Sequence, residues 1–146
     1  PAELGPKGLQ NYNLPKVRRL ELAWANGIAS ARGLAAIYEA VIDGSGRLIR
    51  PETLDQVLPR QSFEWDNVLH KPIGWSLGFV KEEPHLFSPN SEAIGHPGAG
   101  GALGLADPTH GLAIGYVMNK MDGRLRSPRC LALCHAVYEV LGEAAP

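Results

Sequence analysis

The sequence AIGHPGAGGALGLADPTHGLAIGYVM, residues 93–118, decides the fold. Residues 93–106 consist largely of glycine and small apolar residues, and the turn sequence DPTHG at 107–111 follows them. Residues 112–118 (LAIGYVM) have no polar face, which is typical of a central strand covered on both sides. We therefore predict a β-hairpin whose turn lies at 107–111.

The flanking segments predict one more strand and three helices. Residues 73–80 (IGWSLGFV) alternate large and small side chains between two prolines, which predicts the additional strand. Helical spacing of apolar residues, with capping residues at the ends, predicts helices over 30–44, 51–59 and 127–142. This order of elements predicts an α+β fold, in which helices cover an antiparallel sheet of three strands.

The beginning of the chain shows no such pattern. Residues 1–28 contain scattered prolines and glycines, so we predict an irregular lead with one short element near 17–22. The helices and the sheet then occupy residues 29–146. Because a three-strand sheet has edges that need neighbours, we predict that residues 1–146 form a single but partial domain. Any targeting signal is expected outside this chain, so the sequence predicts no localisation.

The composition is that of a foldable globular domain and excludes several classes of function. The 14 Lys and Arg residues and the 15 Asp and Glu residues give a net charge of −1, which gives little support to binding of nucleic acid or anionic lipid. Hydrophobic residues make up 45% and charged residues 20%, which excludes a disordered tail. No apolar run approaches the ~18 residues of a membrane span. We expect neither nucleic acid nor a membrane as a partner.

The cysteines and histidines do not predict a metal site. Cys130 and Cys134 lie four residues apart in the predicted C-terminal helix, where disulfide geometry is rarely met, so we expect two apolar core residues. The histidines lack the HxH and HxxxH spacing of a metal site. We expect Asp107 to shape its turn and His110 to be solvated there. Only His96 lies in a chemically suggestive context.

The densest candidate site is GHPGAGG at residues 95–101. Glycines within a strand mark a bulge or a close approach of a ligand or another backbone. Free N–H groups on such a strand can serve as oxyanion donors or pair with an extended substrate. The alternative is that the glycines only permit tight packing of the hairpin against a helix, and composition alone slightly favours this alternative.

Five segments, in this order, resemble the C-terminal portion of the serine β-lactamase-related family, which includes class C β-lactamases, related esterases and peptidases, and penicillin-binding proteins. They are ANGIASARGLAAIYEAV (25–41), LIRPETLDQV (48–57), IGWSLGFV (73–80), IGHPGAGGALGLADPTHGLAIGYVMNKM (94–121) and the terminal helix. The resemblance implies an antiparallel sheet between helical layers. It also implies acyl transfer from a small ester, amide or β-lactam to a serine, with no cofactor.

The same resemblance assigns roles to the glycine-rich segment. The family's third motif, often Lys-Thr-Gly, aligns with residues 96–98, as a His-x-Gly variant that is familiar among esterase-like members. Ala99 follows the motif and would donate its backbone N–H to the oxyanion hole, so His96 and Ala99 are the candidate catalytic residues. The candidate substrate-binding residues, which would keep the strand surface open, are Gly98, Gly100 and Gly101. A histidine in place of lysine favours esters over β-lactams.

Half of the family's active site is absent from this sequence. Neither its Ser-x-x-Lys nucleophile motif nor its Tyr-x-Asn motif occurs here. We therefore expect the missing N-terminal portion of the same fold as a partner, and inactivity of the chain alone. We also expect self-association, because a sheet without its early strands exposes apolar surface. The alternative function is a non-catalytic binding or assembly domain that uses an open sheet edge.

The resemblance also makes a geometric prediction. We expect residues 96–101 to form a strand antiparallel to residues 112–118. The Ala99 N–H should then face a cleft without a partner, because an oxyanion donor must stay available for the developing charge. If the glycines only permit close packing, that N–H should instead be bonded to a neighbouring strand.

Overall fold

The computed structural model describes residues 8–81, 86–124 and 126–143, and divides the chain into two compact units, residues 1–30 and 31–146. The first unit holds a 3-10 helix, η2 (Gly8–Asn13), and a one-turn helix, α1 (Pro15–Arg18). The short element predicted near 17–22 therefore begins earlier, because Pro15 occupies the first helical position. No described helix is long and apolar enough to cross a membrane.

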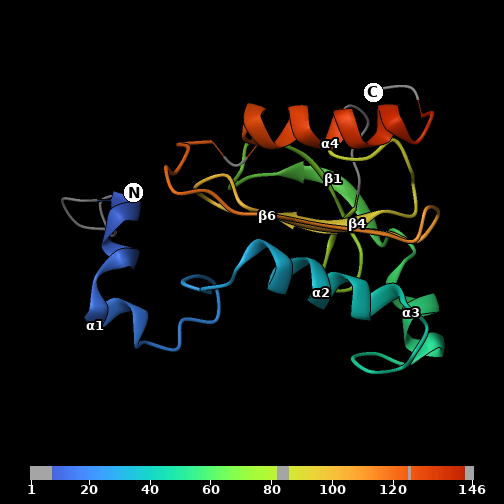
Figure 1. Ribbon diagram of the computed structural model, residues 1–146, viewed down its shortest axis with the longest axis horizontal. Helices are drawn as coiled ribbons and strands as arrows, with labels where there is room; N and C mark the ends of the chain where they lie inside the picture. Colours follow the sequence, from blue (N-terminus) through green and yellow to red (C-terminus); the bar gives the residue numbers. More distant parts are fainter. Residues whose placement is uncertain (1–7, 82–85, 125, 144–146) are drawn as a thin grey trace. The chain divides into compact units, whose positions relative to one another are not determined.

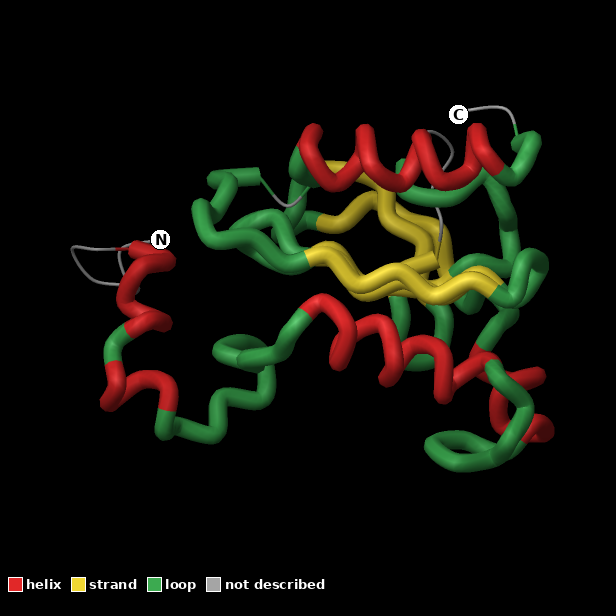
Figure 2. The backbone as a smooth tube through the Cα atoms, in the orientation of Figure 1, coloured by secondary structure: helices red, strands yellow, loops and turns green. Residues whose placement is uncertain are grey.

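The second unit is an α+β fold with a six-stranded antiparallel sheet, shown in Figures 1 and 2. Its helices are α2 (Ala31–Ile42), α3 (Pro51–Val57) and α4 (Pro128–Val140), which confirms the three predicted helices. Its strands are β1 (Ser62–Asp66), β2 (Lys71–Trp75), β3 (Val80–Lys81), β4 (Ile94–Pro97), β5 (Leu103–Asp107) and β6 (Leu112–Tyr116). Each strand pairs with the next one along the chain, so the sheet order is β1-β2-β3-β4-β5-β6.

The prediction of three strands is wrong, because turns divide two of the predicted strands and one strand was not predicted. The segment 73–80 folds into parts of β2 and β3, joined by a turn in which the Ser76 N–H donates to the Phe79 carbonyl at 2.9 Å. Gly78, with φ of +92°, supplies the left-handed conformation of this turn. The unpredicted strand, β1, has four exposed residues among its five, so burial imposes no period on its sequence.

The glycine-rich segment corrects the predicted pairing. Residues 98–102 turn the chain back, so β4 pairs with β5, with His96 opposite Gly104. Strand β5 in turn pairs with β6 across the predicted turn at 107–111. The hairpin prediction is thus confirmed for β5 and β6. The prediction that residues 96–101 pair with residues 112–118 is wrong, because β5 lies between them.

Helix α4 covers one face of the sheet and α2 the other, as Figure 1 shows. Side chains of β5 alternate between the two layers, and Leu103 and Leu105 pack in a core with Cys130 and Cys134. Both cysteines are free and 1% exposed, which confirms the prediction of core residues. On the α2 side the strands carry glycine, because a Cβ at Gly104 would collide with the Tyr38 ring.

A buried polar cluster joins the end of β5 to α4. Asp107 is 0% exposed and accepts hydrogen bonds from the Tyr138 hydroxyl at 2.8 Å, the Asn90 side-chain amide at 2.7 Å and the Thr109 N–H at 2.9 Å. Asp107 therefore shapes its turn, as predicted. Burial opposes its ionisation, but the hydrogen bonds outweigh burial and hold the pKa of the Asp107 carboxyl below its ordinary value.

His110 belongs to the same cluster, so the prediction that it is solvated is wrong. Its Nδ1 lies 3.3 Å from Asp107 Oδ2 and its Nε2 lies 3.2 Å from Glu143 Oε1. The imidazole also makes an edge contact with the Tyr138 ring, with centroids 6.0 Å apart. These contacts stabilise the β5–β6 turn against the end of α4.

Candidate functional site

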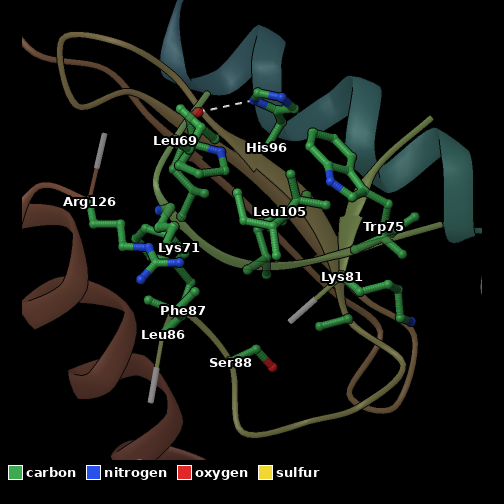
Figure 3. Close-up of a pocket in the computed structure, with 17 residues that line it drawn as sticks. Leu69, Lys71, Trp75, Lys81, Leu86, Phe87, Ser88, His96, Leu105 and Arg126 are labelled. Atoms are coloured by element: carbon green, nitrogen blue, oxygen red, sulfur yellow. Dashed lines mark hydrogen bonds between the residues drawn. The ribbon is translucent and has the colours of Figure 1, made fainter. Parts of the chain in front are cut away.

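His96 lies on β4, and its side chain is exposed. Its Nδ1 lies 3.0 Å from the Pro97 carbonyl oxygen. Because a carbonyl only accepts, this contact places a proton on Nδ1 and leaves Nε2 of the neutral ring as an acceptor. Figure 3 shows the imidazole beside the Trp75 indole. The centroids of the two rings are 6.1 Å apart.

The glycine-rich sequence after His96 forms a tight turn between β4 and β5. The Gly98 N–H donates to the Ala102 carbonyl at 2.7 Å, and the Gly101 N–H donates to the Gly98 carbonyl at 3.0 Å. Gly100 and Gly101 have φ of +103° and +99°, which side chains other than glycine adopt only with strain. The turn therefore depends on glycine for its backbone conformation.

Ala99 occupies the exposed tip of this turn. Among the residues that the structure describes, none accepts a hydrogen bond from the Ala99 N–H. This donor is thus absent from the β-ladder, unlike the donors of β4 and β5, and its setting is a turn rather than the predicted strand. The geometry is compatible with an oxyanion donor, and that role stays a prediction.

The three candidate substrate-binding glycines differ in their surroundings. A Cβ at Gly100 would lie 3.4 Å from Met121 Cγ, and a Cβ at Gly101 would lie 3.0 Å from Ser127 Cβ. Both residues are buried, but only at Gly101 is the packing tight enough to disfavour a side chain, whereas at Gly100 the positive φ is what requires glycine. Gly98 is half-buried, and a Cβ at this position would lie 3.6 Å from Ala102 Cβ, an ordinary contact.

A cavity of about 160 Å³ lies next to His96 (Figure 3). His96 and Pro97 line it, whereas residues 98–101 do not. Most of its wall is apolar and comes from β2 to β5 and the residues after β3; the large apolar side chains are Leu69, Ile73, Trp75, Val80, Leu86, Phe87, Ile94, Leu103 and Leu105. Three basic residues, Lys71, Lys81 and Arg126, also line it, and no described lining residue is acidic.

One nucleophile-like pattern lies in the turn between β2 and β3. Residues 74–78 read GWSLG and match the GxSxG pattern, which in hydrolases places an exposed serine on a turn from a strand to a helix. Here Ser76 is buried in the turn between two strands, and its Oγ lies 3.4 Å from the Phe79 carbonyl. The structural context of a nucleophile is therefore absent at Ser76.

The described residues thus include three features that acyl-transfer sites use. They provide an unpaired N–H, a histidine and an apolar cavity, and they include no cluster of three or more His, Cys, Asp or Glu that could hold a metal ion. Sequence reasoning found the histidine and the donor. It missed the cavity, because its wall combines residues from segments far apart in the chain, and no local pattern marks them.

Comparison with known proteins gives a consistent set of matches. The beta-lactamase family model matches residues 2–132. The chain is 33% identical over 134 residues to the esterase/beta-lactamase LipL of Mycobacterium tuberculosis strain ATCC 25618 / H37Rv, a match over 86% of this chain and 29% of LipL.

Solved structures match at the level of fold and sequence. The similarity to a penicillin-binding protein homolog from Caulobacter crescentus has a TM-score of 0.78 with 38% identity, over 92% of this chain and 36% of that one. The similarity to EstA from Arthrobacter nitroguajacolicus Rue61a has a TM-score of 0.78 with 34% identity, and it covers 89% of this chain and 37% of EstA. The chain therefore spans about a third of the length of these relatives.

Proposed function

The chain belongs to the beta-lactamase family, and from this membership we propose that it is the C-terminal portion of a serine hydrolase. The reaction is acyl transfer on esters, amides or β-lactams. One observation carries the proposal: the Ala99 N–H, from which no described residue accepts, directly follows the His-Pro-Gly motif, and His96 and Pro97 of that motif line an apolar cavity. The relationship to an esterase/beta-lactamase supports the same class of reaction.

In the proposed mechanism, the serine lies in the portion of the fold outside this chain. The resemblance implies that the lysine or the tyrosine of the absent motifs takes the proton of the serine hydroxyl. The serine oxygen attacks the substrate carbonyl carbon, and the carbonyl oxygen becomes an oxyanion. The Ala99 N–H donates to this oxyanion at about 2.7–3.1 Å and stabilises the transition state more than the substrate. The carbonyl reforms, and the bond to the alcohol or amine breaks as that group takes up the proton removed from the serine. Water later attacks the acyl-serine carbonyl, which releases the carboxylic acid and restores the serine hydroxyl.

The cavity favours an ester with an apolar group. Its wall carries Trp75 beside His96 and leucine side chains deeper in the core, so an apolar acyl or alcohol group would gain free energy by leaving water there. A histidine at position 96 offers one acceptor or donor in place of a permanently charged lysine. We therefore propose esters as the preferred substrates over β-lactams.

Replacement of the Ala99 amide by an ester linkage tests the oxyanion role, because it removes the N–H and leaves the side chain. Semisynthesis would introduce the linkage into a hydrolase that contains this chain and the Ser-x-x-Lys portion. We expect kcat for p-nitrophenyl butyrate to fall about 100- to 1,000-fold. The free energy of unfolding should fall by no more than about 1 kcal/mol, because no described residue accepts from this N–H and the substitution only weakens the Gly98 carbonyl as an acceptor for the Gly101 N–H. An unchanged kcat would contradict the assignment.

The isolated chain supplies the second test. It lacks the nucleophile, so we expect no hydrolysis of p-nitrophenyl esters or nitrocefin above a buffer control. Labelling with a fluorophosphonate should likewise fail for the chain alone and succeed for a longer protein with Ser-x-x-Lys. Burst kinetics from the isolated chain would contradict this proposal.

The open edge of β6 favours a second candidate function, in which the chain binds or assembles without catalysis. Within the described residues β6 pairs only with β5, and its sequence LAIGY carries no charge that would discourage pairing with another strand. We propose that this edge pairs with the remaining strands of the same fold, or with a second copy when they are absent. Sedimentation of the isolated chain tests the latter, and a clean monomer would contradict it.

A further inference from the structure

The residues after β6 pack directly against the glycine turn at 98–102. The Asp122 N–H donates to the Gly100 carbonyl at 2.7 Å. Met121 and Ser127 fill the space beside Gly100 and Gly101, as the close approaches of their side chains show. This segment therefore covers the buried side of the turn, while Ala99 stays exposed at its tip.

The Asp122 carboxylate organises this segment internally. Its Oδ1 accepts from the Arg124 N–H at 3.2 Å, and its Oδ2 accepts from the Ser127 hydroxyl at 3.1 Å. Arg129 Nη2 lies 3.9 Å from the same Oδ2 and donates to the Lys120 carbonyl at 2.9 Å. Ser127 is 1% exposed at the start of α4, so Asp122 links the segment to a fixed helix end.

We propose that Asp122 is a positioning residue for the oxyanion donor, an inference that rests on the proposed function. Two consecutive glycines give the turn wide conformational freedom, and only two hydrogen bonds within the turn restrain it. The contacts of the Asp122 carboxylate fix the backbone of this residue. The Asp122 N–H then fixes the Gly100 carbonyl through its hydrogen bond. The Gly100 carbonyl and the Gly101 N–H belong to one peptide group, and the Gly101 N–H donates to the Gly98 carbonyl, which shares a peptide group with the Ala99 N–H. The contact with Asp122 therefore limits rotation of the donor.

The loop after α2 offers a matched control. Asp43 accepts from the Ser45 hydroxyl at 2.6 Å and lies 3.9 Å from Arg47 Nη2, so it repeats the Asp-Ser-Arg arrangement. The described polar contacts of its carboxylate stay within residues 43–47. Asp43→Ala therefore removes the same kind of cluster without touching the glycine turn.

Amide hydrogen exchange in this chain measures the restraint directly. We expect the Gly101 and Asp122 amides to exchange about tenfold faster in Asp122→Ala, since their hydrogen bonds lose support, and to keep their rates in Asp43→Ala. Asp122→Asn should restore most of the protection, because its side-chain oxygen still accepts a hydrogen bond. Ser127→Ala removes one contact of the cluster and should give an intermediate rate, which keeps the test open if Asp122→Ala does not fold.

Catalysis supplies the second readout. In a hydrolase that contains this chain and the serine, Asp122→Ala should lower kcat about tenfold with KM unchanged, and Asp43→Ala should change neither. Exchange rates in Asp122→Ala that match those in Asp43→Ala would overturn the inference. If that protein has no hydrolytic activity, the proposed function fails, and the role in catalysis fails with it, whereas the exchange rates alone still decide whether Asp122 restrains the turn.

Discussion

Tyr138→Phe tests the buried cluster that joins β5 to α4. The Tyr138 side chain is 0% exposed, and its hydroxyl donates to the Asp107 carboxylate at 2.8 Å. A hydrogen bond to a charged group contributes about 1.5–3 kcal/mol to stability. We therefore expect the free energy of unfolding to fall by about 2–3 kcal/mol.

Urea unfolding followed by circular dichroism measures this loss, provided that wild type and variant have the same m-value. Tyr38→Phe is the matched control on the opposite face of the sheet. The Tyr38 hydroxyl has no hydrogen bond to a described residue, although burial raises the pKa of Tyr38 to about 12. This control should change stability by less than about 0.5 kcal/mol. Equal effects of the two substitutions would refute the reasoning that the Asp107 contact stabilises the fold.

Three further predictions concern acid, the turn and the thiols. The pKa of Asp107 is lowered in the folded state, so the ionised carboxylate stabilises the fold fully above its ordinary pKa of about 4, and this stabilisation is lost as the pH falls below that value. Asp107→Asn should therefore weaken the dependence of the free energy of unfolding on pH between about pH 4 and pH 2. Gly101→Ala adds a close contact to a left-handed backbone, and should destabilise by about 1–2 kcal/mol more than Gly46→Ala, whose φ is +72° with open space around it; thermal unfolding compares them. Cys130 and Cys134 are each 1% exposed, so Ellman's reagent should label them only as the chain unfolds; rapid labelling of the folded chain would contradict their burial.

The sequence predicted elements where a local period or a local turn signal was strong. Helix α2 and the β5–β6 hairpin follow from apolar spacing and from the turn at 107–111. Strand β1 could not be found in this way, because both of its faces are exposed and only pairing with β2 holds it extended. The turn at residues 98–102 was missed because glycine permits both an open strand and a reversal, and the contact with Asp122 that favours the reversal comes from 20 residues later.

The candidate site was predictable to a similar extent. The family resemblance singled out His96 and Ala99, and the structure places His96 on β4 and Ala99 in the turn between β4 and β5. The packing of Gly100 against Met121 was not predictable, since the two residues meet only through the fold. The same holds for His110, whose turn sequence suggests solvent, although Glu143 at the far end of the chain contacts it.

The sequential order of the strands has a consequence for the way this sheet assembles. Every strand pairs with its immediate successor, so each pairing closes a loop far shorter than the chain between α2 and β5, and hairpins such as β5–β6 can form early. Helix α2 is different, because it packs on β5 and β6 across more than 60 residues of chain. Docking of α2, with the Tyr38 ring seated over Gly104, is therefore the step with the largest loss of chain entropy, and it is the step that we expect to limit the folding rate. Substitutions in α2 should then slow folding, whereas substitutions in β1 should mainly speed unfolding.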